Sequence, residues 1–212
     1  MGTGSSISPD ASSKQSEGSG LKMARRCVFI LGGARSGKSR LAQEMAQRLG
    51  GKVLFVATGA PLDEEMSFRI EAHKKKRPRS WRTLEAGIGV GEKIMTEIRD
   101  AEVVVVDCVT LLVSNVLLSG GEEGKAEAEQ IDYASAEGRV VAEIEGLIRC
   151  IKSTKATFII VSNEVGMGVV PVYKTGRIYR DLLGRANQLL AQQAGDVYLM
   201  VAGIPWRLKG KG

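Results

Sequence analysis

The sequence has few of the residues and patterns that mark several common classes of protein. Its single histidine and its three widely spaced cysteines, Cys27, Cys108 and Cys150, show no metal-ligand spacing. An odd number of scattered cysteines favours a reduced, cytoplasmic protein over a disulfide-stabilised secreted one. No apolar run approaches the roughly 18 residues that a membrane helix needs, so we expect no membrane span. The sequence shows no internal repeat either.

The length and composition favour one folded domain preceded by a tail. Residues 1–22 are rich in serine and glycine and contain almost no large apolar side chains, so we expect them to be disordered. A targeting or interaction role for this tail stays open. We expect residues 23–212 to form a single domain, since 190 or so residues suffice for one sizeable core. The net charge of +6 suits anionic small molecules as well as nucleic acid and does not separate them.

The strongest motif lies in residues 27–39. An apolar run over 27–31 predicts a buried strand, which ends at Gly32 and Gly33. The spacing Gly32-x-x-x-x-Gly37-Lys38-Ser39 then fits the phosphate-binding loop at every fixed position, and a helix-forming stretch follows over 40–49. Such a loop directs backbone N–H groups at an anion, with Lys38 reaching the β- and γ-phosphates and the Ser39 hydroxyl on Mg²⁺.

Apolar runs alternate with helix-like segments along the rest of the chain. The sequence predicts strands over 53–57, 81–85, 102–107, 157–161 and 197–201. Helices are expected over 63–76, 91–98, 109–118, 140–152 and 173–194, the last interrupted near Gly184. Residues 119–137, rich in glycine and glutamate, are predicted to be a solvated loop or insertion. This alternation indicates an α/β fold of the P-loop NTPase type, with a largely parallel sheet flanked by helices.

Asp107 ends the valine-rich strand predicted over 102–107. Open α/β sheets bind ligands at the carboxyl ends of their strands. A carboxylate there, in a chain that also has a phosphate loop, is typical of the second element of P-loop proteins, which supports Mg²⁺ directly or through water. A strand-end aspartate with no ligand role is the alternative.

His73 stands in a strongly basic run, in which six Lys or Arg accompany one Glu between Glu71 and Arg82. A neutral imidazole is a competent nucleophile toward phosphorus, and the surrounding cations would offset phosphate charge. Two other interpretations stay open at this point: a solvated helix end, and a nucleic-acid patch, which no interleaved aromatic residue supports.

Several longer blocks resemble one family. They are Gly32-Gly33-Ala34-Arg35-Ser36-Gly37-Lys38-Ser39, Ala57-Thr58, Asp63-x-Glu65-Met66-x-x-Arg69-Ile70, His73-Lys74, Arg77-Pro78-x-x-Trp81-Arg82-Thr83-x-Glu85, Asn163-Glu164-Val165-Gly166-Met167-Gly168-Val169-Val170-Pro171 and Arg180-Asp181-x-x-Gly184-Arg185-x-Asn187-Gln188. They resemble the bifunctional adenosylcobinamide kinase/adenosylcobinamide-phosphate guanylyltransferases of cobalamin biosynthesis. The resemblance extends from about residue 27 to residue 204.

The resemblance implies two reactions. A nucleoside triphosphate, ATP or GTP, would phosphorylate the aminopropanol hydroxyl of adenosylcobinamide. GTP would then guanylylate an enzyme histidine, and the GMP would pass to adenosylcobinamide phosphate to give adenosylcobinamide-GDP. Some members of the family carry two adjacent histidines in this block, whereas this chain has Ala72 before His73. His73 is therefore its sole candidate nucleophile, or guanylyl transfer is absent. The resemblance also implies a homotrimer.

The same resemblance implies a set of site residues. His73 and Lys38 would be catalytic, and Ser39 and Asp107 would hold Mg²⁺. Glu85 would accept hydrogen bonds from the guanine or the ribose, and Glu164 is a candidate base on its strand-end position alone. The nucleotide site would comprise Gly32, Gly33, Ala34, Arg35, Ser36, Gly37, Lys38, Ser39, Thr58, Gly59, Ala60, Lys76, Arg77, Pro78, Arg79, Glu85 and Asp107.

Three other functions deserve comparison with this one. A P-loop kinase of another small alcohol would lack nucleotidyl transfer. A regulatory GTPase would need an Asn-Lys-x-Asp element to recognise guanine, and this sequence does not contain that element. A nucleic-acid-binding ATPase rests only on the basic run around His73, so we expect no nucleic-acid partner.

Overall fold

The computed structural model describes Met1 and residues 27–59, 77–119 and 131–210. Seven strands form one sheet in the order β3-β2-β4-β5-β1-β6-β7. The strands are β1 (Cys27–Gly32), β2 (Val53–Ala57), β3 (Arg82–Glu85), β4 (Val103–Asp107), β5 (Thr157–Val161), β6 (Asp196–Val201) and β7 (Ile204–Lys209). All neighbouring strands run parallel except β6 and β7. The predicted α/β class with a largely parallel sheet is confirmed.

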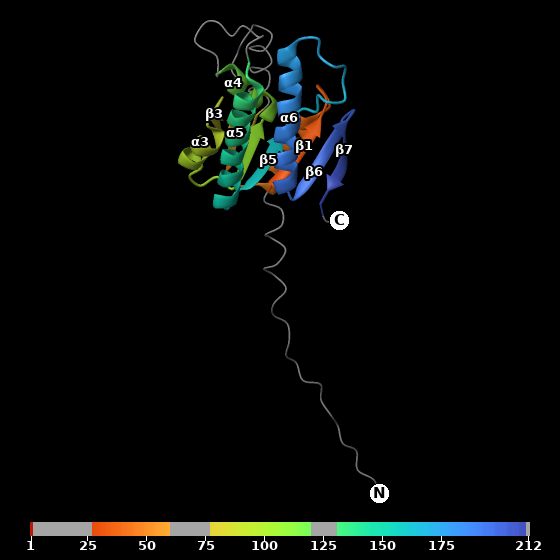
Figure 1. The fold of residues 1–212 in the computed structure, drawn as a ribbon. Coiled ribbons are helices and arrows are strands. Elements are labelled where there is room, and N and C mark those ends of the chain that lie inside the picture. Colours follow the sequence, from red (N-terminus) through yellow and green to blue (C-terminus); the bar gives the residue numbers. More distant parts are fainter. Residues whose placement is uncertain (2–26, 60–76, 120–130, 211–212) are drawn as a thin grey trace.

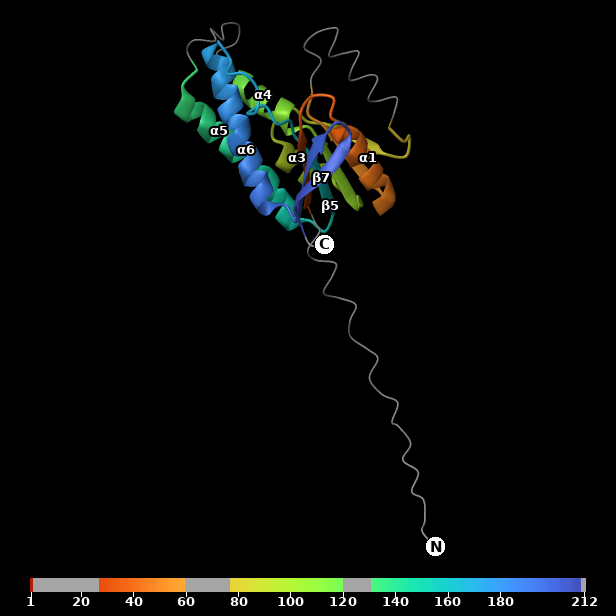
Figure 2. The same ribbon diagram turned by 90° about the vertical axis from the view of Figure 1, so that its right-hand side faces the viewer.

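Helices cover both faces of the sheet, and the sheet is seen almost edge-on in Figure 2. The helices are α1 (Lys38–Leu49), α3 (Val90–Glu97), α4 (Val109–Leu118), α5 (Tyr133–Ser153) and α6 (Lys174–Gln193). Helix α1 packs on β1, β4 and β5 from one side. On the opposite side α3, α4, α5 and α6 pack against one another in a second layer (Figures 1 and 2).

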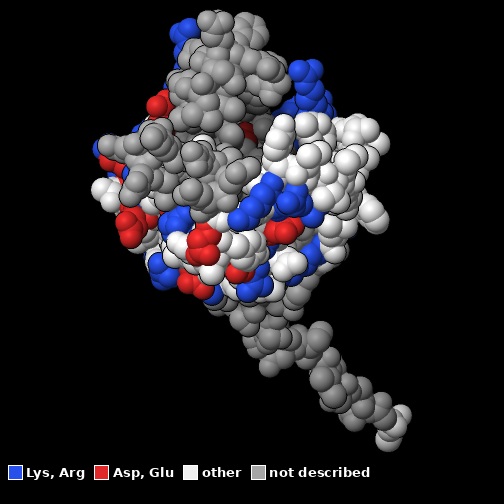
Figure 3. All heavy atoms as spheres, turned by 45° about the horizontal axis from the view of Figure 1, so that its top comes forward, with Lys and Arg blue, Asp and Glu red and all other residues white. Residues whose placement is uncertain are grey.

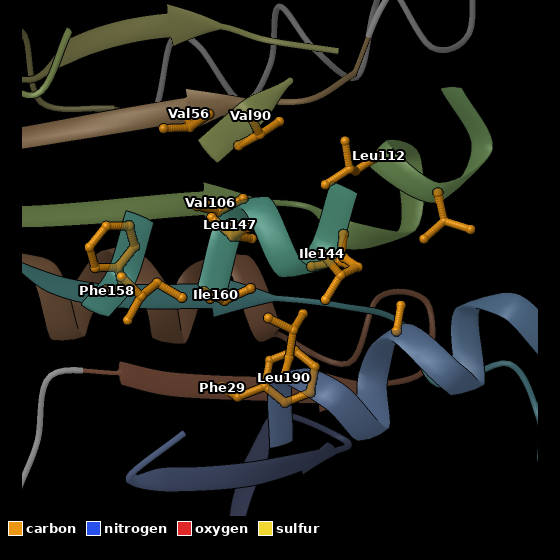
Figure 4. Close-up of a cluster of buried hydrophobic side chains, with 14 of the residues drawn as sticks. Phe29, Val56, Val90, Val106, Leu112, Ile144, Leu147, Phe158, Ile160 and Leu190 are labelled. Carbon is orange, nitrogen blue, oxygen red and sulfur yellow. The ribbon is translucent and has the colours of Figure 1, made fainter. Parts of the chain in front are cut away.

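The central strands are apolar on both faces because both faces are covered. Val104 and Val106 of β4 point into the larger core, which also includes Ile144 and Leu147 of α5 (Figure 4). The alternate residues of the same strand, Val103 and Val105, join the smaller core beneath α1. A continuous valine run therefore fits the centre of this sheet.

The structure corrects the sequence-based prediction in three places. Helix α5 begins at Tyr133, inside the segment predicted to be loop, because Asp132 accepts a hydrogen bond from the Ser135 N–H and caps it. Helix α6 continues through Gly184 without interruption. Strand β7 was not predicted; it pairs antiparallel with β6 across the turn at Ala202 and Gly203, both of which have positive φ.

The strands predicted over 53–57, 81–85, 102–107 and 157–161 are present within a residue or two, as are the helices over 91–98 and 109–118. The predicted helix over 63–76 and the predicted tail fall mainly or wholly outside the described residues. Within the described part of the chain, no helix combines the length and the apolar character needed to cross a membrane.

Candidate active site

The phosphate loop connects β1 to α1 at the carboxyl edge of the sheet, which is uppermost in Figure 1. Gly32 and Gly37 have φ values of 152° and 98°, a region that residues with a side chain rarely adopt. A Cβ at Gly32 would lie only 2.5 Å from the Met200 carbonyl oxygen. Glycine is thus required where the loop passes β6. The loop leads directly into the first turn of α1, where backbone N–H groups favour an anion.

Lys38 lies almost buried beneath this loop. Its Nζ donates a 2.6 Å hydrogen bond to the Gly33 carbonyl oxygen and a longer one, 3.5 Å, to Ser36 Oγ. Burial lowers the pKa of the Lys38 ammonium, while the nearby Asp107 carboxylate acts in the opposite direction. A bound phosphate would compete with the Gly33 carbonyl for this ammonium and would favour its charged form.

A cleft of about 600 Å³ opens between the loop and the ends of β2, β3, β4 and β5. Its size is within the usual range for nucleotide and cofactor sites. We call it the first cleft. It is lined by Ala34, Arg35, Ser36, Gly37, Lys38, Ser39, Arg40, Phe55, Ala57, Gly59, Arg77, Glu85, Asp107, Cys108, Thr110, Leu111, Val161 and Asn163.

Arg77 enters the first cleft over an aromatic floor. Its guanidinium carbon lies 3.7 Å from the centroid of the Phe55 ring, a cation–π arrangement, and Phe55 stacks in turn on Trp81. Burial lowers the pKa of Arg77, and the charges of Asp107 and Glu85 oppose that change. The Arg77 Nε and Nη1 atoms are buried and have no hydrogen-bond partner among the described residues. Two unsatisfied donors on a half-buried cation are well suited to a phosphate or another anion.

The oxygen-bearing residues of the cleft fit Mg²⁺ held together with a nucleotide. Ser39 and Asp107 both line the first cleft. Among the described residues, no group of three His, Cys, Asp or Glu side chains could hold a metal by itself. Mg²⁺ commonly takes only one or two protein oxygens and completes its shell with phosphates and water. The donor set therefore fits a nucleotide-borne magnesium ion rather than a resident protein-bound metal.

Thr58 supports the cleft from below. It is fully buried, and its hydroxyl donates to the Cys108 carbonyl oxygen at 2.7 Å and accepts from the Cys108 N–H at 2.8 Å. The Asn115 amide donates to the carbonyl oxygens of Thr58 and Gly87. These bonds tie the ends of β2, β3 and β4 together, so that Gly59, Glu85 and Asp107 come to one edge.

The structure brings most of the predicted site residues together. Those that line the first cleft are Ala34, Arg35, Ser36, Gly37, Lys38, Ser39, Gly59, Arg77, Glu85 and Asp107. Gly32 and Thr58 are buried beside it, whereas Pro78 and Arg79 are not among its lining residues. Ala60, His73 and Lys76 lie outside the described residues.

Asn163 is a lining residue to which the sequence analysis gave no role. Its N–H donates to the Thr110 hydroxyl at 2.8 Å, and its carbonyl oxygen accepts from Asn187 at 3.1 Å. The Asn187 oxygen accepts in turn from the buried Ser162 hydroxyl. Because β5 lies between β4 and β1, Asn163 falls between Asp107 and the phosphate loop. The strand-end rule that singled out Asp107 would have found it.

A second cleft, of about 380 Å³, lies on the other side of the phosphate loop, toward β6. It is lined by Gly33, Ala34, Arg35, Ser36, Glu164, Met167, Leu199, Met200, Val201 and Ala202. Ala34, Arg35 and Ser36 border both clefts. The loop is thus a shared wall with a cleft on each side.

Charged side chains of both signs lie on the described surface near the carboxyl edge of the sheet. Over the described part of the face turned forward in Figure 3, Lys and Arg are interspersed with Asp and Glu. Nucleic-acid-binding domains instead tend to gather basic residues in one patch or stripe. The described part of this face therefore lacks the concentrated basic patch that is typical of nucleic-acid-binding domains.

Comparison with known proteins agrees with this geometry. Residues 28–208 match the family described as cobinamide kinase / cobinamide phosphate guanyltransferase. The chain is 42% identical over 182 residues to the bifunctional adenosylcobalamin biosynthesis protein CobU of Escherichia coli, covering 86% of this chain and 99% of that protein. It is 40% identical to the CobU of Salmonella typhimurium over the same shares. Identity to the CobP of Pseudomonas aeruginosa is 38%, over 86% of this chain and 97% of that protein.

Proposed function

The chain belongs to the cobinamide kinase / cobinamide phosphate guanyltransferase family, and on that premise we propose which of its residues carry the two reactions. It is a bifunctional transferase of cobalamin biosynthesis. The observation that carries the assignment is the first cleft, in which a complete phosphate loop, an aspartate and a half-buried arginine with unsatisfied donors meet. These are the groups that phosphoryl and nucleotidyl transfer need.

In the kinase reaction, the aminopropanol hydroxyl of adenosylcobinamide attacks the γ-phosphorus of ATP or GTP. A new O–P bond forms, the bond from the γ-phosphorus to the β,γ-bridging oxygen breaks, the hydroxyl proton is released, and the nucleoside diphosphate leaves. Lys38 offsets the charge that develops on the β- and γ-phosphates. Ser39 and Asp107 would hold Mg²⁺, which neutralises phosphate charge when it is bound. Asn163, at the end of β5, lies on the side of the loop where the γ-phosphate would be.

In the guanylyltransferase reaction, an imidazole nitrogen of His73 attacks the α-phosphorus of GTP. An N–P bond forms, the bond to the α,β-bridging oxygen breaks, and pyrophosphate leaves. A phosphate oxygen of adenosylcobinamide phosphate then attacks the same phosphorus, displaces the histidine and gives adenosylcobinamide-GDP. Dividing the transfer into two displacements replaces one difficult step with two easier ones.

The described residues support a place for His73 near the first cleft. The chain leaves the described part of the structure after Gly59 and re-enters it at Arg77, and both of these residues line the cleft. His73 precedes Arg77 by only four positions, a distance of at most about 14 Å along an extended chain. Arg77, with two unsatisfied donors, would bind the GTP phosphates. Glu85 would accept hydrogen bonds from the guanine or the ribose.

We also propose a cytoplasmic homotrimer. Ile204, Trp206 and Leu208 alternate along β7, the edge strand beside β6, and are 69%, 64% and 52% exposed. Val169, Val172 and Tyr173 are also strongly exposed. Large apolar side chains clustered on an edge strand favour association with another copy of the chain.

One labelling experiment tests the two-step mechanism. The protein is incubated with Mg²⁺ and GTP labelled at its α-phosphate, without the corrinoid, and protein-bound label is tested for acid lability and alkali stability. We expect such label on the wild type, none on His73→Ala, and strongly reduced label on Lys38→Met.

The same variants separate the competing functions. His73→Ala should still phosphorylate adenosylcobinamide, because the kinase reaction does not use the histidine. A wild type that phosphorylates the corrinoid but never takes up label would be a P-loop small-molecule kinase without nucleotidyl transfer. Undiminished label on His73→Ala would rule out this histidine as the nucleophile.

A further inference from the structure

The phosphate loop has a cleft on each side, and the reactions proposed above assign ligands only to the first cleft. The second cleft shares Ala34, Arg35 and Ser36 with the first and extends toward β6. We propose that the second cleft binds the nucleoside of the triphosphate used in the kinase reaction. This inference rests on the proposed function. It implies that the loop holds nucleotides in two opposite directions, one for each reaction.

The direction of the kinase nucleotide follows from where the metal ligands lie. Asp107 ends β4, and β4 lies on the β5 side of β1. If Ser39 and Asp107 hold the Mg²⁺ that neutralises the triphosphate, the γ-phosphate would lie on the side of Asp107 and Asn163. The α-phosphate, and the nucleoside attached to it, then leave the loop on the opposite side of β1. That side holds β6 and the second cleft.

The walls of the second cleft suit a nucleoside. Met167, Leu199, Met200 and Val201 provide apolar surface for the face of a base, and methionine adapts well to aromatic rings. Its volume of about 380 Å³ lies at the small end of the usual range for ligand pockets. A nucleoside fits such a volume better than a whole corrinoid does.

Glu164 supplies a directed hydrogen-bond acceptor in this cleft. Its N–H donates to the Gly32 carbonyl oxygen at 3.0 Å, which fixes it against the loop. One of its carboxylate oxygens, Oε1, accepts the Gly166 N–H at 2.7 Å. This bond orients the carboxylate, and the other oxygen can then accept from a ribose hydroxyl or an exocyclic amino group of the base. Polar groups fixed in this way give an otherwise apolar pocket its specificity.

Guanylylation requires the opposite direction. There the α-phosphorus must react, and the residues proposed for the guanine and the phosphates of GTP, Glu85 and Arg77, line the first cleft. The nucleoside of GTP would therefore occupy the first cleft in this reaction and the second cleft in the kinase reaction. In both cases the reacting phosphorus lies on the first-cleft side of the loop, where the corrinoid can reach it.

Calorimetric binding to the full-length protein in the presence of Mg²⁺ tests the inference. The probes are the β,γ-imido analogue of ATP and inorganic triphosphate, which fills the loop but carries no nucleoside. We expect Glu164→Gln and Met167→Ala each to weaken binding of the ATP analogue about tenfold and to leave inorganic triphosphate binding unchanged. Met95→Ala, an exposed methionine on α3 that lines neither cleft, is the matched control and should change neither affinity.

Kinetic measurements on the same variants identify the occupant. The KM of the kinase reaction for its nucleotide should rise in Glu164→Gln and Met167→Ala, with little change in the KM for adenosylcobinamide. The GTP concentration needed for covalent guanylylation should not change in these variants, whereas Glu85→Gln should raise it. A raised KM for adenosylcobinamide alone would assign the second cleft to the corrinoid and overturn the inference.

Two further outcomes would overturn it. Equal losses of affinity for the ATP analogue and inorganic triphosphate would show that the variants merely disturb the loop. If the wild type bound both probes equally tightly, the nucleoside would contribute nothing to binding and the second cleft would not hold it. Failure of the proposed function can be distinguished from failure of this inference. The first would appear as absent guanylylation or absent phosphorylation in the wild type, whereas the comparison of the two probes tests nucleoside binding in the second cleft independently.

Discussion

The role of Thr58 illustrates how far the function of a side chain depends on its burial. The family resemblance predicts Thr58 as part of the nucleotide site, yet both hydrogen bonds of its hydroxyl go to the backbone of Cys108. Its side chain therefore holds the ends of β2 and β4 together, and Gly59 and Asp107 provide the cleft surface. A strand-end position indicates that a residue is near a site but not whether its side chain faces the ligand.

Replacing Thr58 by valine should destabilise the protein by about 1–3 kcal/mol, because the buried Cys108 N–H would lose its partner. Thr58→Ser, which keeps the hydroxyl, is the matched control and should cost clearly less. Urea denaturation followed by circular dichroism measures both changes. Equal losses in the two variants would show that the methyl group, rather than the hydrogen bonds, matters.

Cys27 makes the free energy of unfolding depend on pH in the alkaline range. The thiol is buried at the start of β1, and burial raises its pKa to about 12. An unfolded chain releases this proton near pH 8.5. The stabilisation due to the neutral thiol is complete below that pH and is lost as the pH rises toward 12.

The free energy of unfolding should therefore fall more steeply with pH in the wild type than in Cys27→Ala. The difference in slope should approach about 1.4 kcal/mol per pH unit between pH 9 and 12. Denaturant titrations at several pH values measure both slopes. Parallel slopes would mean that this thiol does not remain neutral in the folded state.

At the level of elements, glycines decide where helices can approach one another. Helix α3 packs closely on α5, and a Cβ at Gly91 would lie 2.4 Å from the Gly146 carbonyl oxygen. Gly184, in α6, has no neighbouring atom within 4 Å of the position its Cβ would take. The two residues look alike in the sequence, and only packing distinguishes them.

Gly91→Ala should destabilise the protein by about 1–3 kcal/mol, because the added methyl group would force α3 away from α5. Gly184→Ala should stabilise it by about 0.5–1 kcal/mol, since alanine is the better helix former and meets no obstacle. The two variants are each other's control, and thermal unfolding compares them directly. Loss of stability in Gly184→Ala would indicate that α6 needs a glycine there after all.

At the level of the whole molecule, β7 presents an apolar edge. The turn at Ala202 and Gly203 returns the chain antiparallel to β6 and places Ile204, Trp206 and Leu208 at one end of the sheet. Side chains of this kind are expected to be covered by another protomer.

The substitution Trp206→Glu should therefore convert the proposed trimer to monomers, because a buried carboxylate without a partner is costly at an interface. Sedimentation velocity measures the oligomeric state. Met95→Glu, on the exposed surface of α3, is the control and should remain trimeric. A monomeric wild type would refute the proposed trimer, and a trimeric Trp206→Glu would place its interface elsewhere.

The fold class, the phosphate loop and the family can all be predicted from the sequence. Those features are local: a buried parallel strand is a continuous apolar run, and the loop needs fixed residue types at fixed spacing. The loop predicted over 119–137 extends too far into α5 because the cap at Asp132 is a single hydrogen bond, which is a weak signal in the sequence. The break predicted near Gly184 is wrong because glycine, although a poor helix former, does not interrupt α6. Tertiary packing outweighs such weak local preferences.

Which strand ends meet, and therefore which residues surround the loop, depends on the folding of the whole sheet. Asn163 and Asp107 are 56 positions apart, and only the strand order brings β5 between β4 and β1. The second cleft likewise depends on β6 passing beside Gly32, where a side chain would strike the Met200 carbonyl oxygen. Spacing along the chain can specify a phosphate site, but the surfaces on either side of it come from segments that meet only when the sheet forms.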